Sequence, residues 1–267
     1  YEDHKSKGLM STKVYDSIIK LVQEGVKEAK LKKITLSFFG AEPLLAYKKI
    51  VSPIIKQVAS ICRDFSKDLE ISFVTNGFLW KKDILKEISE CTYTGFNIGT
   101  IYIGGGTPSY LEVHEIKKLL ETVNKLQFVD DMEFTMECNP GTVNEEKLIA
   151  MKDGGINRIS FGLQSCNNEL LKIIGRIHTY EEFVDNYKLA RKLGFNNINV
   201  DLMYGLPNLT VDLWKDTLAK ICNLKPEHIS AYSLIIEEGT AFYSLYNKNK
   251  LNLPSEDDER IMDKLTK

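Results

Sequence analysis

Two spacings of apolar residues alternate along this chain, and they predict a succession of helices and strands. Apolar positions three or four apart, such as Val14, Ile18 and Leu21, are typical of an amphipathic helix. Short β-rich runs ended by glycine or polar residues are typical of strands. Helices are predicted from Ser11–Thr12 to about Ala29, over 47–65, 82–90, 112–126, 144–153, 180–193 and 211–223, and from Ser255 onward; strands are predicted over 34–39, 70–74, 100–103, 132–136, 158–163, 198–203 and 229–235.

Strands that alternate with helices of ten or more residues predict a parallel sheet with right-handed crossovers. Seven such strands are close to the number found in an α/β barrel. The same early strand–helix unit occurs twice, once around Gly40-Ala41-Glu42-Pro43 and once around Gly104-Gly105-Gly106-Thr107-Pro108. We therefore expect two related pieces, residues 1–97 and 98–267, joined without a long linker and paired in one continuous sheet.

Composition limits the classes of function. Of the 267 residues, 43% are hydrophobic and 27% are charged, as in ordinary globular proteins. A net charge of −2 gives no electrostatic reason to expect nucleic acid or an anionic membrane as a partner. The sequence shows neither a long apolar span nor the apolar stretch of a signal peptide, so a cytoplasmic location is the expectation.

Five cysteines are present, and the two closest in sequence, Cys138 and Cys166, are 28 positions apart. An odd number without short spacings argues against a disulfide framework and against a zinc knuckle. We expect most of the cysteines to be small buried side chains, with Cys138 the least certain because its strand end is polar.

Polar residues and glycines gather at the predicted carboxyl ends of the strands. In parallel α/β folds these ends face the ligand, so the pattern predicts a binding site. The residues concerned include Gly40, Gly104, Gly105, Gly106, Asn76, Glu137, Gln164 and Asp201.

Each candidate also has a simpler interpretation. Gly105, Gly106 and Thr107 would let the backbone approach a ligand, or they would simply form a tight turn. Glu137 could hold an ammonium group or a ribose hydroxyl, or form a salt bridge across the barrel mouth. Taken alone, each of these motifs is compatible with either interpretation.

The remaining candidates complete a possible zwitterion site. Gln164 could bind a carboxylate through its amide, and Arg176 could grip the same carboxylate with two hydrogen bonds, although a solvated surface arginine is the alternative. Asp201 lies in an apolar strand, where a carboxylate without a partner is costly, so a functional role is favoured. Together these groups could bind an amino-acid end plus a sugar.

From residue 98 onward, six motifs resemble the oxygen-independent coproporphyrinogen III oxidase family of radical S-adenosylmethionine proteins, and within it the haem-chaperone branch. The motifs are Thr100-Ile-Tyr-Ile-Gly-Gly-Gly-Thr-Pro108, Glu137-Cys-Asn-Pro-Gly141, Ile159-Ser-Phe-Gly-Leu-Gln-Ser165, Gly175-Arg-Ile-His178, Asp201-Leu-Met-Tyr-Gly-Leu-Pro207 and His228-Ile-Ser-Ala-Tyr-Ser-Leu-Ile-Ile-Glu-Glu-Gly-Thr240. The resemblance implies S-adenosylmethionine as small-molecule partner and a link to haem or porphyrin. It implies contacts to S-adenosylmethionine from Gly105, Gly106, Thr107, Glu137, Gln164, Arg176 and Asp201.

Residues 1–97 resemble another branch of that superfamily, the sulfatase- and peptide-maturase group known as SPASM. The matching stretches are Gly8-Leu-Met-Ser11, 34–45 and Phe73-Val-Thr-Asn-Gly77, although Ala41 replaces a glycine usual in that group. We therefore expect a chimeric or truncated α/β protein, a partial and open TIM barrel of about seven βα units.

One departure from both families affects the expected activity. Their Cys-x-x-x-Cys-x-x-Cys loop, which holds a [4Fe–4S] cluster in the family, occurs nowhere in this sequence. We therefore expect a protein that has no catalytic turnover and no metal ligands. The alternatives are a cluster-free module that binds S-adenosylmethionine or acts as a scaffold, and an artificial join without an evolved function.

Overall fold

The computed structural model describes residues 10, 12–38, 43–75, 84, 87, 98–126 and 128–267, with the backbone alone at 43, 73–75, 98 and 241. Several predicted features lie outside these residues. They are the Gly40–Glu42 motif, Asn76, Cys91 and most of the predicted helix 82–90, of which Ile84 and Glu87 are described and are helical.

The described residues form parallel strands separated by helices, as the periodicity predicts. The strands are β1 (Lys33–Phe38), β2 (Asp68–Thr75), β3 (Ile98–Ile103), β4 (Phe128–Cys138), β5 (Arg158–Gln164), β6 (Ile198–Tyr204) and β7 (His228–Ser233). The α-helices are α1 (Thr12–Gly25), α2 (Ser52–Asp64), α4 (Val113–Val123), α5 (Glu145–Asp153), α6 (Asn168–Ile173), α7 (Tyr180–Lys192), α8 (Val211–Leu224), α9 (Ala241–Asn247) and α10 (Glu256–Thr266), with short turns η1 (Pro43–Ala46), η2 (Tyr47–Val51) and η3 (Pro108–Tyr110).

Two helices escaped the sequence prediction. The short helices α6 and α9 contain six and seven residues, too few to show a helical period. Side-chain caps mark their starts instead: Asn167 accepts hydrogen bonds from the amides of Glu169 and Leu170, and Thr240 accepts one from Tyr243. The last helix begins where it is predicted, and Ser255 caps it by accepting a hydrogen bond from the amide of Asp258.

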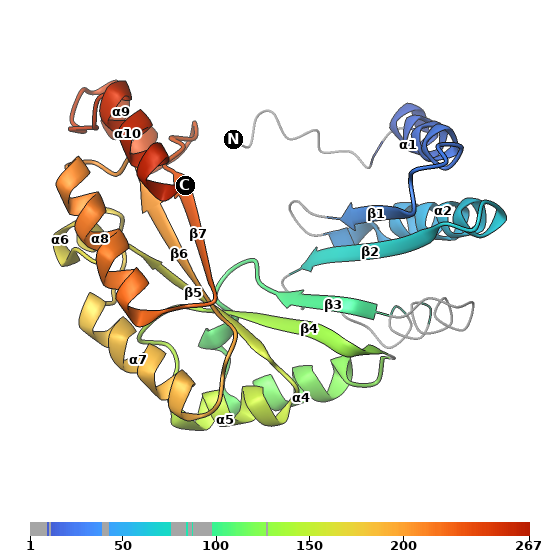
Figure 1. The fold of residues 1–267 in the computed structure, drawn as a ribbon, viewed down its shortest axis with the longest axis horizontal. Coiled ribbons are helices and arrows are strands. Elements are labelled where there is room, and N and C mark those ends of the chain that lie inside the picture. Colours follow the sequence, from blue (N-terminus) through green and yellow to red (C-terminus); the bar gives the residue numbers. More distant parts are fainter. Residues whose placement is uncertain are drawn as a thin grey trace.

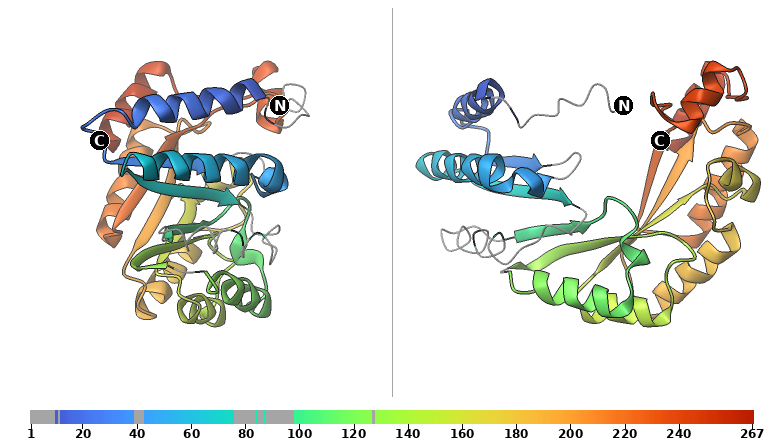
Figure 2. Two further views of the ribbon diagram at one scale, coloured as in Figure 1. Left: turned by 90° about the vertical axis from the view of Figure 1, so that its right-hand side faces the viewer. Right: turned by 180° about the vertical axis from the view of Figure 1, so that it is seen from behind.

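Within the described residues the seven strands form one parallel sheet in the order β1-β2-β3-β4-β5-β6-β7. Each strand is followed in the sheet by the next one in sequence, so right-handed crossovers place all helices on the same face. The sheet consequently curls into an open half-barrel, with α4, α5, α7 and α8 along its convex side (Figures 1 and 2). The predicted α/β fold, a partial and open barrel, is confirmed.

The main core lies between the convex face of β3–β7 and these helices. Phe134, Met136, Phe161 and Val200 are fully buried there, and Phe161 meets Phe183 of α7 edge to face at 5.8 Å between ring centroids. Burying one such large side chain stabilises a fold by about 1.5–3 kcal/mol, so this layer supplies much of the driving force.

The first two strands have smaller apolar clusters of their own. Val22 of α1 and Ile54, Val58 and Cys62 of α2 pack together against β1. Among the described residues, β2 pairs with β3 through Val74 with Tyr102 and Thr75 with Ile103. The division of the chain at residue 98 stays a prediction. In the part of the chain described, no helix is long and apolar enough to cross a membrane.

Candidate ligand site at the carboxyl ends of the strands

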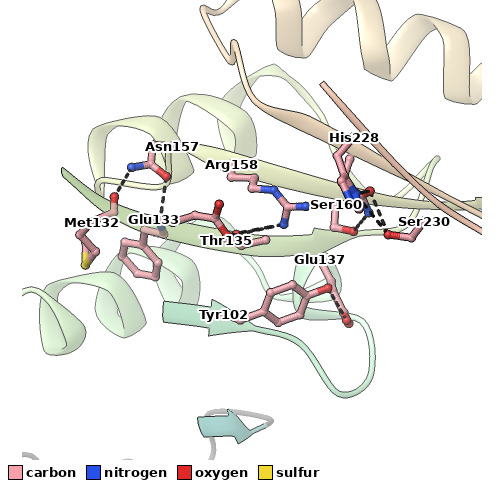
Figure 3. A network of polar contacts seen from close by, with 12 residues as sticks. Tyr102, Met132, Glu133, Thr135, Glu137, Asn157, Arg158, Ser160, His228 and Ser230 are labelled. Carbon is pink, nitrogen blue, oxygen red and sulfur yellow. Dashed lines mark hydrogen bonds and ion pairs between the residues drawn. The ribbon is translucent and has the colours of Figure 1, made fainter. Parts of the chain in front are cut away.

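Polar side chains line the concave face of the half-barrel. Along β4, Phe134 and Met136 enter the core, whereas Thr135 and Glu137 lie on the opposite, concave face. The same alternation continues in β5, β6 and β7, which contribute to this face Ser160, Asn199, Asp201, His228, Ser230 and Tyr232. Figure 3 shows part of this network, with Tyr102 beside Glu137 and with Ser160, His228 and Ser230 grouped together.

Glu137 closes against the glycine turn that follows β3. Its Oε1 accepts a hydrogen bond of 2.9 Å from the Tyr102 hydroxyl, and its Oε2 accepts one of 3.2 Å from the Gly105 amide. Gly105 and Gly106 have φ angles of 84° and 150°, which favour glycine. The tight turn is therefore present. It also places a backbone amide against the Glu137 carboxylate, so a tight turn and a close approach of the backbone to another group are compatible.

Burial raises the pKa of the Glu137 carboxyl above its ordinary value, although the bonds from Tyr102 and Gly105 act in the opposite direction. Among the described residues, Glu137 has no cationic partner, so the alternative salt bridge across the mouth is not found. A half-buried carboxylate without a counter-ion is suited to a cationic ligand group.

Thr107 and Gln164 are linked through Asn139. The Asn139 side chain donates a hydrogen bond of 2.9 Å to the Thr107 hydroxyl. Its carbonyl oxygen lies over Gly162, where an added Cβ would be 2.7 Å from that oxygen and 3.4 Å from Gln164 Nε2. The close approach explains a glycine inside β5 and brings the two predicted residues to one corner of the mouth.

Gln164 is strained, buried and incompletely paired. It has a φ of 75° at a register shift of β5, and only 6% of it is exposed. Its Oε1 has no hydrogen-bond partner among the described residues. A buried acceptor without a donor costs about 1–3 kcal/mol, which a bound ligand with an N–H or O–H group would recover.

Asp201 lies in the middle of β6, not at its end as the sequence suggested. Its Oδ1 accepts hydrogen bonds of 2.7 Å from Asn199 Nδ2 and 2.7 Å from the Tyr232 hydroxyl, and its Oδ2 accepts one of 3.1 Å from Ser160. The aspartate is half-buried, and its partners come from its own strand and from the two neighbouring strands. This network explains why a carboxylate is tolerated within an apolar strand.

Arg176 follows α6 and lies within electrostatic range of Asp201, not at a strand end. The side chain is half-buried and is therefore not the fully solvated surface arginine of the alternative interpretation. Burial lowers the pKa of the guanidinium, while the charge of Asp201 opposes this. Among the described residues the guanidinium makes no hydrogen bond or ion pair, which leaves its donors available to a ligand.

Several residues of this face were not predicted from the sequence. They are Tyr102, Ser160, Asn199, His228 and Tyr232, and the prediction from strand ends does not include them. The strict polar–apolar alternation of Asn199, Asp201 and of His228, Ser230, Tyr232 could have identified them, since period two marks one face of a strand.

The described cysteines offer a poor donor set for an iron–sulfur cluster. Of the four described cysteines, Cys62, Cys138 and Cys166 are buried, as predicted for most of them, whereas Cys222 is exposed. Burial raises the pKa of the Cys166 thiol to about 12 and that of Cys138 higher still, which opposes thiolate formation. Within the described ranges, no group of three or more His, Cys, Asp or Glu side chains could hold a metal.

Comparisons with known proteins identify the class. Residues 95–221 match the family model of the Radical SAM superfamily. The solved structure of coproporphyrinogen III oxidase (HemN) from Escherichia coli, described as a radical SAM enzyme, is 28% identical, with a TM-score of 0.57 over 64% of this chain and 40% of that one. Residues 95–221 are therefore a radical SAM domain, and the half-barrel is the fold of that superfamily.

The curated relatives define the branch. The heme chaperone HemW of Bacillus subtilis is 40% identical over 168 residues, and that of Lactococcus lactis is 42% identical over 174 residues. These matches cover 62% and 63% of this chain but 44% and 46% of the relatives, so the chain matches less than half of their length. The chain thus contains a radical SAM domain related to HemW and HemN, while the SPASM-like interpretation of residues 1–97 stays a prediction.

Proposed function

We propose that the rim formed by the carboxyl ends of β3–β5 and the interior of β6 binds S-adenosylmethionine. The observation that carries the proposal is the buried Gln164 Oε1, which has no hydrogen-bond partner among the described residues. Gln164 lies near the corner that Asn139 and Thr107 form. Radical SAM membership supports the choice of ligand.

The described residues fit the parts of this ligand. Glu137 offers a carboxylate without a counter-ion to the positive charge of the ammonium and sulfonium groups. Arg176 offers unused donors to the carboxylate, and Asp201 offers an acceptor to a ribose hydroxyl. In this superfamily, S-adenosylmethionine bound next to a [4Fe–4S] cluster supplies radical chemistry; the residues named here bind and orient the molecule.

Calorimetry tests this proposal directly. We expect saturable binding of S-adenosylmethionine and S-adenosylhomocysteine, weakened at least tenfold in Glu137→Gln and Arg176→Ala. Lys172→Ala is the matched control, because this lysine is exposed and pairs only with Glu169 on the surface of α6. No heat at millimolar ligand, or equal losses in the control, would contradict the proposal.

We further propose that residues 1–267 by themselves do not cleave the bound molecule reductively. The five cysteines, at 62, 91, 138, 166 and 222, include no Cys-x-x-x-Cys-x-x-Cys arrangement, and three of those described are buried. Anaerobic reconstitution with iron, sulfide and a reductant should yield no stoichiometric cluster absorbance and no 5′-deoxyadenosine. Formation of both in one equivalent per chain would overturn this part.

A haem or porphyrin partner for this chain is an additional proposal, because its relatives are heme chaperones. Titration with hemin, followed by the Soret absorbance, tests it. Saturation at one equivalent supports the partner, whereas a spectrum equal to that of free hemin excludes it for these 267 residues.

A further inference from the structure

Asn199 occupies the centre of the concave face and is held on both ends of its amide. Its Oδ1 accepts hydrogen bonds from His228 Nδ1 at 2.5 Å and from the Ser230 hydroxyl at 3.0 Å. Its Nδ2 donates to the Ser160 hydroxyl at 2.7 Å and to Asp201 Oδ1 at 2.7 Å. The side chain is 2% exposed, so neither end can turn to water without leaving a buried group unpaired.

The charge of Asp201 decides which way this amide faces. A flipped amide would place Oδ1 against the carboxylate, where both atoms are acceptors, and would place Nδ2 against the hydroxyl and ring donors. Because Asn199 Oδ1 can only accept, His228 Nδ1 carries the proton of this bond. Hydrogen bonds therefore run in one direction, from His228 through Asn199 to Asp201.

The two carboxylate oxygens of Asp201 differ in the number of hydrogen bonds that they accept. Oδ1 accepts from both Asn199 and Tyr232, which uses its two lone-pair positions. Burial and the neighbouring carboxylate raise the pKa of the Tyr232 hydroxyl, so this residue remains a donor near neutral pH. Oδ2 accepts only from Ser160 among the described residues, which leaves one acceptor position.

We propose that Asp201 accepts a single ribose hydroxyl through Oδ2, and that Asn199 is the positioning residue that imposes this by occupying Oδ1. The inference rests on the proposed binding of S-adenosylmethionine and specifies how its sugar is recognised. A carboxylate with both oxygens free would instead grip the two adjacent hydroxyls together. Arg176 interacts electrostatically with Asp201 but makes no hydrogen bond to it, so the free position is open to the ligand.

The outer end of this hydrogen-bond path reaches solvent at the amino-terminal ends of the strands, on the same concave face. His228 is exposed and lines a cavity of about 590 Å³ at the amino-terminal ends of β4–β7, together with Glu133, Arg158 and Glu227. Glu227 is paired with Arg191 at 2.8 Å, and Arg158 lies near Glu133. His228 is therefore accessible to solvent while its Nδ1 keeps the bond to Asn199.

Calorimetry of the whole chain with S-adenosylhomocysteine and its 2′-deoxy and 3′-deoxy analogues tests the inference. One analogue should bind at least tenfold more weakly than the parent, and the other within about threefold. Comparable losses for both analogues, or for neither, would overturn the inference alone. Absence of binding by the parent nucleoside would overturn the proposed function and the inference with it.

Two variants separate positioning from a structural role. Tyr232→Phe frees one lone pair of Oδ1, so Asp201 can accept the second ribose hydroxyl as well. The analogue that the wild type binds almost as well as the parent should then bind more weakly than the parent. A general loosening of the site would not produce this new difference. Tyr246→Phe on α9 is the matched control, since these two tyrosines are 47% and 50% exposed. Asn199→Asp, of the same shape, places a carboxylate oxygen against Asp201 and should abolish the difference between the two analogues. An unchanged pattern in both variants would contradict the assignment of Asn199.

Discussion

The carboxyl group of Glu137 occupies the space that any side chain at position 104 would need. A Cβ added to Gly104 would lie 2.6 Å from Glu137 Cδ and 2.7 Å from both Glu137 Oε1 and Tyr102 Cε1. The end of β3 and the end of β4 therefore determine each other's sequence. The glycine is required by close approach, since Gly104 itself shows no left-handed φ.

Gly104→Ala should destabilise the protein and impair binding of S-adenosylmethionine together. Relief of the contact requires displacement of Glu137 or Tyr102, and overpacking of this kind costs about 1–3 kcal/mol. Urea unfolding and calorimetry measure the two effects. Gly99→Ala on the same strand is the control, because its Cβ would meet nothing within 4 Å. Equal stability of the two variants would show that the mouth is more pliable than the packing indicates.

Glu137→Gln should change how stability depends on pH. Because burial raises the pKa of Glu137, the folded protein retains a proton that the unfolded chain releases at lower pH. This contribution is present below the ordinary glutamate pKa and is lost as the pH rises through the raised value. Urea unfolding from pH 4 to pH 8 should therefore show the wild type losing stability relative to Glu137→Gln. A difference that is flat, or that grows in favour of the wild type, would contradict the raised pKa.

Arg176→Lys should weaken S-adenosylmethionine about tenfold, equivalent to about 1.4 kcal/mol. Lysine keeps the charge but cannot form the paired hydrogen bonds of a guanidinium with a carboxylate. Methylthioadenosine has no amino-acid carboxylate, so its affinity should be the same for wild type and variant. Equal losses for both ligands would show that Arg176 acts on the pocket as a whole.

Alkylation of the native protein should distinguish Cys222 from the other described cysteines. Cys222 is exposed on α8, whereas Cys62, Cys138 and Cys166 are buried and burial raises the pKa of each thiol. Brief treatment with iodoacetamide at pH 8, followed by peptide mass mapping, should modify Cys222 first. In guanidinium chloride all four should react alike. Rapid native labelling of Cys138 would show that the end of β4 opens in solution.

The order of strands and most helix boundaries could be predicted because they depend on local periodicity. Strands β4 to β7 and helices α5, α7 and α8 lie within a few residues of their predicted ranges. The glycine turn, Glu137 and Gln164 could be predicted as candidates, since glycine and polar residues at the ends of apolar strands are visible in one dimension. Tyr102 and Asn199 could not be predicted as site residues in this way, because their roles depend on partners that are distant in the sequence or on other strands.

The parallel α/β class and a short set of rim residues follow from the sequence alone. The alternation of strand and helix patterns is a local property, and so is the type of residue at each strand end. Tertiary structure decided which atoms of those residues remain available. Register between β6 and β7 sets Asn199 against His228 and Asp201 against Ser230, and curling of the sheet brings Arg176 within reach of Asp201. Hydrogen-bond saturation is a property of distances across strands, and no pattern along one strand contains it.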